Sequence, residues 1–153
     1  MFTKLFLRLF LTILPLIYMW LIWLQSSHFN PESLYELTYK IDERILLMIG
    51  MALELGHLFE FGVLYFLLTI MIISYGSLTK PKEWLCFFVA ASYGLIDEIH
   101  QIAVPYRSFS LLDLLKNIIG IIAVWYIVHR SYFVRRNSIF GSKLKQYSTF
   151  LNQ

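Results

Sequence analysis

Three apolar stretches of this 153-residue chain contain side chains that are costly to place in lipid. These acids, bases and amides are Glu54, His57 and Glu60 in one stretch, Asp97, Glu98, His100 and Gln101 in another, and Asp113, Lys116 and Asn117 in the third. Ionisable groups inside such segments usually pair with one another or serve a function. The large number of polar residues in these stretches favours a functional site. The competing interpretation is that the carboxylates, the amides and Arg107 only pair with one another to hold a bundle together.

Three kinds of chemistry suit these residue types. Glu54-x-x-His57 and Asp97-x-x-His100 are carboxylate–histidine pairs of the kind that holds metals in helix bundles. Alternatively, His57 or His100 acts as a general base on a lipid-linked substrate while Arg107 clamps its phosphate. The third possibility is a pocket that binds an amphiphile without catalysis. Because the carboxylate–histidine pattern is short and common, we assign no metal ligand and no catalytic residue from it.

The elements that must position these residues are membrane helices. Hydrophobic residues make up 58% of the chain and charged residues 15%, whereas a soluble domain carries about 25% charged residues. Four stretches, at residues 5–24, 53–74, 84–104 and 111–128, approach the roughly 20 apolar residues that cross a bilayer. They lack the alternation of apolar and polar residues that is typical of β-barrel strands. The sequence therefore predicts an all-α fold, a polytopic membrane bundle of four helices.

Lys and Arg side chains near the span ends predict the orientation. With the N-terminus inside, nine of them lie on the cytoplasmic side and three on the outer side. We therefore expect N-in, C-in, with residues 131–153 as a basic cytoplasmic tail attracted to anionic lipid. Asn30, Pro31 and apolar residues at helical spacing up to Met48 predict a short amphipathic helix on the outer surface between the first two spans. The basic residues are not clustered, so the expected partner is the lipid bilayer and not nucleic acid.

The polar residues converge in the outer half of the predicted bundle. His57, Asp97 and Asn117 lie about four to six residues from the outer ends of their spans, or within roughly 9 Å at 1.5 Å per residue. Helical spacing places Asp97, His100 and Gln101 on one stripe, and Gly120 would let another helix approach closely. The candidate site residues are His57, Glu60, Asp97, Glu98, His100, Gln101, Arg107, Asp113 and Asn117.

The segment from Tyr93 to Gly120 contains Asp97-Glu98-x-His100-Gln101, followed by Arg107, Asp113, Asn117 and Gly120. This pattern resembles the signature of the VanZ-like family of small bacterial membrane proteins. Ser26-Ser27 and His57-x-x-Glu60-Phe61 resemble further motifs of the family, so the resemblance covers residues 5–128 and indicates one VanZ-like domain over residues 1–130. Glu54 departs from the family, because many relatives carry Lys at this position.

The resemblance implies a protein of the bacterial cytoplasmic membrane with a role in the cell envelope. The family is named after a protein associated with resistance to the lipoglycopeptide teicoplanin, an antibiotic. We expect a binding or accessory role on an amphiphilic envelope molecule. The alternatives are an intramembrane hydrolase or transferase acting on a lipid-linked envelope substrate, and a structural membrane subunit. The sequence indicates no particular cofactor, ligand or oligomeric state.

Overall fold

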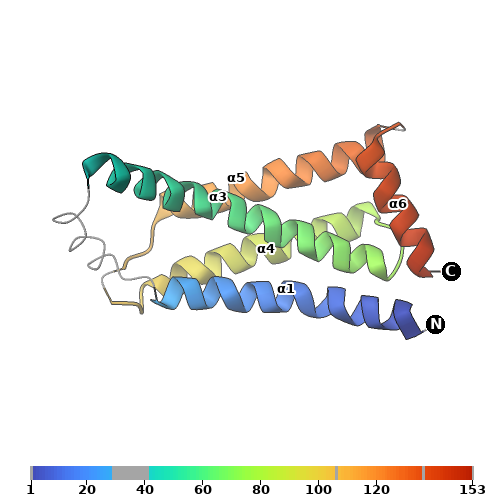
Figure 1. Ribbon diagram of the computed structural model, residues 1–153, viewed down its shortest axis with the longest axis horizontal. Helices are drawn as coiled ribbons and strands as arrows, with labels where there is room; N and C mark the ends of the chain where they lie inside the picture. Colours follow the sequence, from blue (N-terminus) through green and yellow to red (C-terminus); the bar gives the residue numbers. More distant parts are fainter. Residues whose placement is uncertain (1, 29–41, 106, 136, 153) are drawn as a thin grey trace.

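The computed structural model describes residues 2–28, 42–105, 107–135 and 137–152, and all regular structure in these ranges is helical. Within α3, the side chains of residues 43, 46, 49, 50 and 52–54 lie outside this description. Four long helices, α1 (Phe2–His28), α3 (Glu43–Ser74), α4 (Lys80–Gln101) and α5 (Leu111–His129), run along the length of the molecule (Figure 1). The all-α class predicted from the sequence is confirmed for this part of the chain.

Three of the apolar segments are long and apolar enough to cross a membrane, namely Phe2–His28, Leu55–Ser74 and Leu111–Val134. They match the first, second and fourth predicted spans. Helix α4 is less apolar, because it begins with Lys80, Lys82 and Glu83 and ends with the polar group from Asp97 to Gln101. That α4 crosses the membrane, and that the protein is a four-helix membrane bundle, therefore stay predictions.

Helix α3 is much longer than the predicted second span. It begins at Glu43, is capped by the Asp42 carboxylate, which accepts a 2.8 Å hydrogen bond from the Arg44 N–H, and continues for 32 residues to Ser74. Residues 43–48 were expected in a separate amphipathic helix on the membrane surface, and that prediction is wrong for them. No proline separates them from the span, so the helix has no reason to break there. The rest of that predicted helix, residues 31–41, lies outside the described residues.

Helix α3 is the central element, because it contacts α1, α4, α5 and α6. Phe61, Leu64, Tyr65 and Ile73 on α3 are completely buried. The closest approach is to α5, where a Cβ built on Gly120 would overlap the carbonyl group of Leu58. This close crossing confirms the prediction that Gly120 admits a neighbouring helix.

The connection from α4 to α5 is short and ordered by hydrogen bonds. Helix α4 ends at Gln101, three residues before the predicted boundary, and the N–H groups of Ala103 and Val104 bond back to its last turn. Pro105, which has no N–H to donate, follows at once. Ser110 then caps α5 by accepting a hydrogen bond from the Asp113 N–H.

The C-terminal tail is folded against the bundle. A short π-helical turn, η1 (Arg130–Val134), leads into α6 (Ile139–Asn152), which contacts α3 and crosses the end of the molecule where α1 begins (Figure 1). There Arg8 donates hydrogen bonds to the carbonyl oxygen of Leu151 at 2.6 Å and to Asn152 Oδ1 at 2.9 Å. The start of α1 and the end of α6 therefore lie on the same side of the protein, opposite the α4–α5 connection.

Candidate functional site

A small cavity of about 50 Å³ lies at the end of the bundle that is remote from α6. Its lining residues come from three helices and the α4–α5 connection, and they are Ile22, Gln25, Ser26, His57, Glu60, Asp97, Gln101 and Arg107. We call this space the head-group cavity. Its volume admits a few water molecules or a polar group of a few atoms.

Asp97 is the most deeply buried acid of this cavity, with 2% of its surface exposed. Its Oδ2 atom accepts a 2.9 Å hydrogen bond from Gln101 Nε2. Its Oδ1 atom, Ser26 Oγ and His57 Nδ1 are buried and have no hydrogen-bond partner among the described residues. Buried polar atoms of this kind normally have a partner, because leaving them without one costs free energy. Three such atoms from three helices lie around one cavity, which makes it the candidate site.

Arg107 brings a cation to the same cavity. Its guanidinium donates a 3.3 Å hydrogen bond from Nη1 to the carbonyl oxygen of Ser26, at the end of α1. This bond ties the α4–α5 connection to the first helix and holds Arg107 at the cavity that Asp97 and Glu60 also line. The planar fork of the guanidinium suits carboxylate or phosphate oxygens.

A larger groove of about 590 Å³ adjoins the head-group cavity. We call it the lateral groove, and its lining residues are Tyr18, Leu21, Ile22, Leu24, Gln25, His28 and Glu60. Ile22, Gln25 and Glu60 line both spaces, so the groove lies directly beside the cavity. Most of the groove belongs to one side of α1, where Leu21 is about half exposed. A polar cavity beside a largely apolar groove is a suitable shape for an amphiphile.

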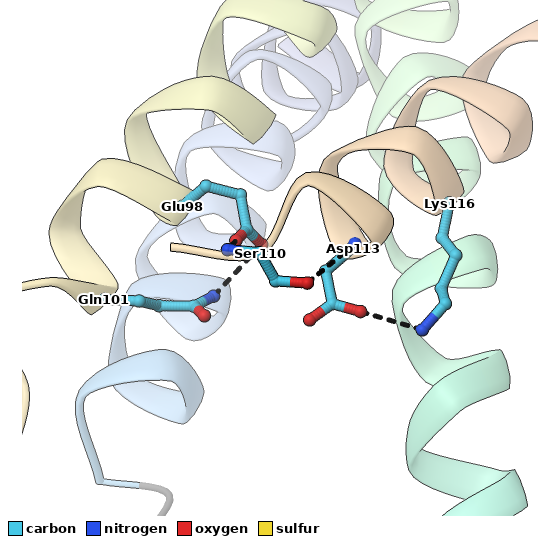
Figure 2. A network of polar contacts seen from close by, with 5 residues as sticks. All are labelled: Glu98, Gln101, Ser110, Asp113 and Lys116. Carbon is cyan, nitrogen blue, oxygen red and sulfur yellow. Dashed lines mark hydrogen bonds and ion pairs between the residues drawn. The ribbon is translucent and has the colours of Figure 1, made fainter. Parts of the chain in front are cut away.

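Gln101 and four further polar residues form a hydrogen-bonded network next to the cavity (Figure 2). The completely buried Glu98 accepts hydrogen bonds from Gln101 Nε2 at 3.3 Å and from the Ser110 N–H at 3.1 Å. Beyond the Ser110 cap, Asp113 forms a 2.8 Å ion pair with Lys116. The hydrogen bond between Glu98 and the Ser110 N–H therefore fastens the start of α5 to the end of α4. Gln101 links this network to Asp97 and the cavity.

Two predicted site residues lie elsewhere. The His100 ring stacks on Trp23, with ring centroids 3.6 Å apart, and so faces α1 outside the cavity. Asn117 on α5 is completely buried. It packs against α4, where a Cβ built on Gly94 would lie 3.5 Å from the Asn117 Cβ. Neither Oδ1 nor Nδ2 of Asn117 has a hydrogen-bond partner among the described residues. The predicted polar region is thus divided into a cavity, a network and these two separate positions.

The metal interpretation gains no support from the geometry. Among the described side chains, no three from His, Cys, Asp and Glu lie close enough together to hold one metal ion. Asp97 and His100 point to different surroundings, although they are only three residues apart. Glu54, the other predicted partner of a histidine, has its side chain outside the described residues.

The sequence interpretation missed two features. Gln25 and Ser26 of α1 line the cavity. Neither side chain is ionisable, so the pattern of charged groups within the predicted spans did not indicate them. At the opposite end of the bundle, Glu83 is 1% exposed and its carboxylate lies 2.9 Å from His129 Nδ1. Glu83 lies near the start of a predicted span, where a charged residue is usually solvated. Its partner, His129, is at the end of α5 and is brought close only by helix packing.

The comparisons with known proteins agree with this structure and with the sequence motifs. No curated protein and no solved structure shows significant similarity to the chain. A family model described as VanZ/LLP1 matches residues 3–134, which include all the helices that line the cavity. With apolar helices of membrane-spanning length and a family match over most of its length, this membrane protein belongs to the VanZ-like family.

Proposed function

We propose that this protein binds the polar head group of an amphiphilic cell-envelope molecule, in a binding or accessory role. The observation that carries the proposal is that the lateral groove adjoins the head-group cavity, since Ile22, Gln25 and Glu60 line both. An amphiphile needs both surfaces at once, a polar one for its head and an apolar one for its chain. The groove lies along α1. Among the described residues, this helix has the most exposed large hydrophobic side chains.

Burial and charge support the same proposal. Asp97 and Ser26 are both more than nine-tenths buried, and each has an atom without a partner among the described residues. Keeping such atoms in an apolar protein costs about 1–3 kcal/mol each, which a bound ligand offsets by hydrogen bonding. A site that is occupied during function recovers this cost when its ligand binds.

The orientation of the protein in the membrane and its location in the cell are also part of the proposal. The positive-inside bias places the start of α1 and the end of α6 in the cytoplasm, so the cavity opens near the outer face of the bacterial cytoplasmic membrane. A protein at that position meets envelope lipids and lipid-linked precursors. The family name adds an expected link to resistance against lipoglycopeptides of the teicoplanin type.

Intramembrane hydrolysis or group transfer on a lipid-linked substrate is the second candidate. It is favoured by His57, which lines the cavity together with Asp97 and Glu60. An imidazole beside carboxylates is a common arrangement for general base catalysis. Conversion of the bound lipid into a product, lost in a His57→Gln variant that still binds the lipid, would favour this candidate over binding alone.

Site-specific photocrosslinking in native membranes tests the proposal. A photoreactive residue at position 25, which lines both the cavity and the groove, should capture one class of lipid above its share of the membrane. The same residue at position 85, an exposed site on α4 outside both spaces, is the control and should capture bulk lipid. Asp97→Asn should remove the enrichment at position 25. Identical lipid profiles at the two positions would contradict the proposal.

A further inference from the structure

We propose that the head-group cavity takes a primary ammonium group, carried by a membrane lipid. This inference rests on the proposed function and adds the chemical class of the ligand. It follows from three properties of the cavity, namely its balance of charge, its atoms without partners and its size.

The charge balance favours a cationic ligand. Among the described residues that line the cavity, Glu60 and Asp97 can carry two negative charges, and Arg107 carries one positive charge. A buried excess of negative charge is expensive in a medium of low dielectric constant. One additional cation neutralises the site, whereas an anionic head group has to compete with both carboxylates for Arg107.

The unpartnered atoms match an ammonium group in number and in type. Asp97 Oδ1 and Ser26 Oγ can each accept a hydrogen bond, and so can His57 Nδ1 when the ring is neutral with its proton on Nε2. A primary ammonium has three N–H donors and no acceptor. Hydrogen bonds between charged partners, such as ammonium and the Asp97 carboxylate, are about twice as strong as neutral ones. A quaternary ammonium has no N–H and cannot form these bonds.

The size of the cavity and its neighbour identify the source of the ammonium. About 50 Å³ accommodates a small polar group such as an aminoethyl end. The lateral groove of about 590 Å³ then lies beside the remainder of the same molecule, with Leu21 and Leu24 available to an acyl chain. A free amine in water gains nothing from this groove, so we assign the ligand to a lipid.

Native mass spectrometry on the full-length chain in detergent tests the inference. The probes are phosphatidylethanolamine, its N-methylated and N,N-dimethylated forms, phosphatidylcholine and phosphatidylglycerol, all with the same acyl chains. Phosphatidylethanolamine should bind at least about tenfold more tightly than phosphatidylcholine, equivalent to roughly 1.4 kcal/mol. Affinity should fall stepwise as methyl groups replace N–H donors. Asp97→Asn should abolish the preference.

The control variant is Glu83→Gln, which removes a buried carboxylate of the same helix at the opposite end and should keep the preference. If Asp97→Asn cannot be extracted in folded form, Ser26→Ala replaces it. Ser26 Oγ has no partner among the described residues, so its removal should not destabilise the protein and should lower the preference about threefold. An unchanged preference in the variant that folds would overturn the inference.

The other outcomes separate the inference from the function on which it rests. Binding of phosphatidylglycerol in preference to phosphatidylethanolamine, lost in Asp97→Asn, would overturn the ammonium assignment and leave head-group binding intact. Phosphoethanolamine without acyl chains that binds as tightly as the lipid would overturn the lipid source. If no lipid binds in a manner that depends on Asp97 or Ser26, the inference and the proposed function both fail.

Discussion

Gln101 is the residue that joins the cavity to the network beside it. Its side-chain amide is 1% exposed and donates to both Asp97 and Glu98. Two neighbouring carboxyl groups in a buried region depend on such a donor, because each loses its contact with water. Gln101 thus holds Asp97 in place while leaving the Oδ1 atom of that residue available.

Gln101→Leu should therefore destabilise the protein. The substitution leaves Asp97 without its described donor, at a cost of about 1–3 kcal/mol, and leaves Glu98 with only the hydrogen bond from the Ser110 N–H. SDS titration of the purified protein, followed by circular dichroism, measures the change in the free energy of unfolding. Ser92→Ala, an exposed position of α4, is the control and should change little. A Gln101→Leu variant as stable as the parent would mean that the two carboxyl groups do not need this donor.

A second prediction for individual side chains concerns the pair of Glu83 and His129. Glu83→Met and His129→Leu should each cost about 1–3 kcal/mol, because each removes one partner of a hydrogen bond to a buried group. The double variant should recover most of the loss, since replacing both partners by apolar groups is often neutral. A double-mutant cycle in the same SDS titration gives the coupling energy. Strictly additive losses would show that the two side chains do not interact.

The sequence predicted which polar residues gather, but not how they divide. Placing Asp97, His100 and Gln101 on one stripe was sound helical geometry, yet a stripe about 100° wide faces more than one neighbour. Gln101 and Asp97 face inward, whereas His100 meets Trp23 of α1. Which neighbour lies beside each edge of the stripe depends on helix packing, and a single sequence contains little information about packing.

At the scale of helices, the crossing of α3 and α5 sets the shape of the bundle. The backbone of α5 at Gly120 lies directly against the carbonyl group of Leu58, and Gly62 of α3 lies close to the carbonyl oxygen of Gly120. Small residues at such crossings let helices pack tightly in lipid, where apolar side chains gain little by leaving their surroundings. This crossing fixes His57 and Glu60, which flank Leu58 on α3, relative to α5.

Gly120→Ala should separate these helices and cost about 1–3 kcal/mol or more, because the added methyl group overlaps backbone atoms that cannot rotate away. Gly56→Ala is the matched control on α3, since a Cβ there meets nothing within 4 Å. It should stabilise the helix slightly, by about 0.5–1 kcal/mol. Thermal unfolding in detergent compares the two variants. The account of the crossing fails if Gly120→Ala is no less stable than Gly56→Ala.

The long helices were largely predictable, and their ends were not. Apolar runs of sufficient length predicted segments at 5–24, 53–74 and 111–128, and helices or apolar segments were found at each. The start of α3 at Glu43 was missed because amphipathic and fully apolar helical patterns can follow one another within a single helix. The α6 helix was missed because the tail was interpreted from its basic, aromatic composition, although its buried residues Gly141, Leu144, Ser148 and Leu151 recur at helical spacing. Its position depends on contacts with η1, α3 and Arg8.

The whole molecule has two polar ends with different characters. One end contains the head-group cavity and the network, and the other contains α6, the Glu83–His129 pair and both ends of the described chain. The positive-inside bias predicts that the second end faces the cytoplasm. The cavity is then available to lipids of the outer leaflet.

Tags on the two termini should therefore react with impermeant reagents only after the membrane is opened on its cytoplasmic side. A single cysteine at position 107–110, in a chain whose Cys86 has been replaced by Ala, should react from outside in intact cells. The reason is the excess of Lys and Arg on the flanks at the α6 end. Labelling of the termini from outside would reverse the orientation and place the cavity in the inner leaflet.

The central claim is that the head-group cavity and the lateral groove hold one amphiphile. The most direct measurement is an experimental structure of the full chain in a lipid nanodisc prepared from native membranes. We predict density for one molecule whose polar end lies within hydrogen-bond distance of Asp97 Oδ1 and whose chain follows Leu21 and Leu24 of α1. A cavity closed by protein side chains, or filled with water beside a groove of disordered bulk lipid, would contradict the account.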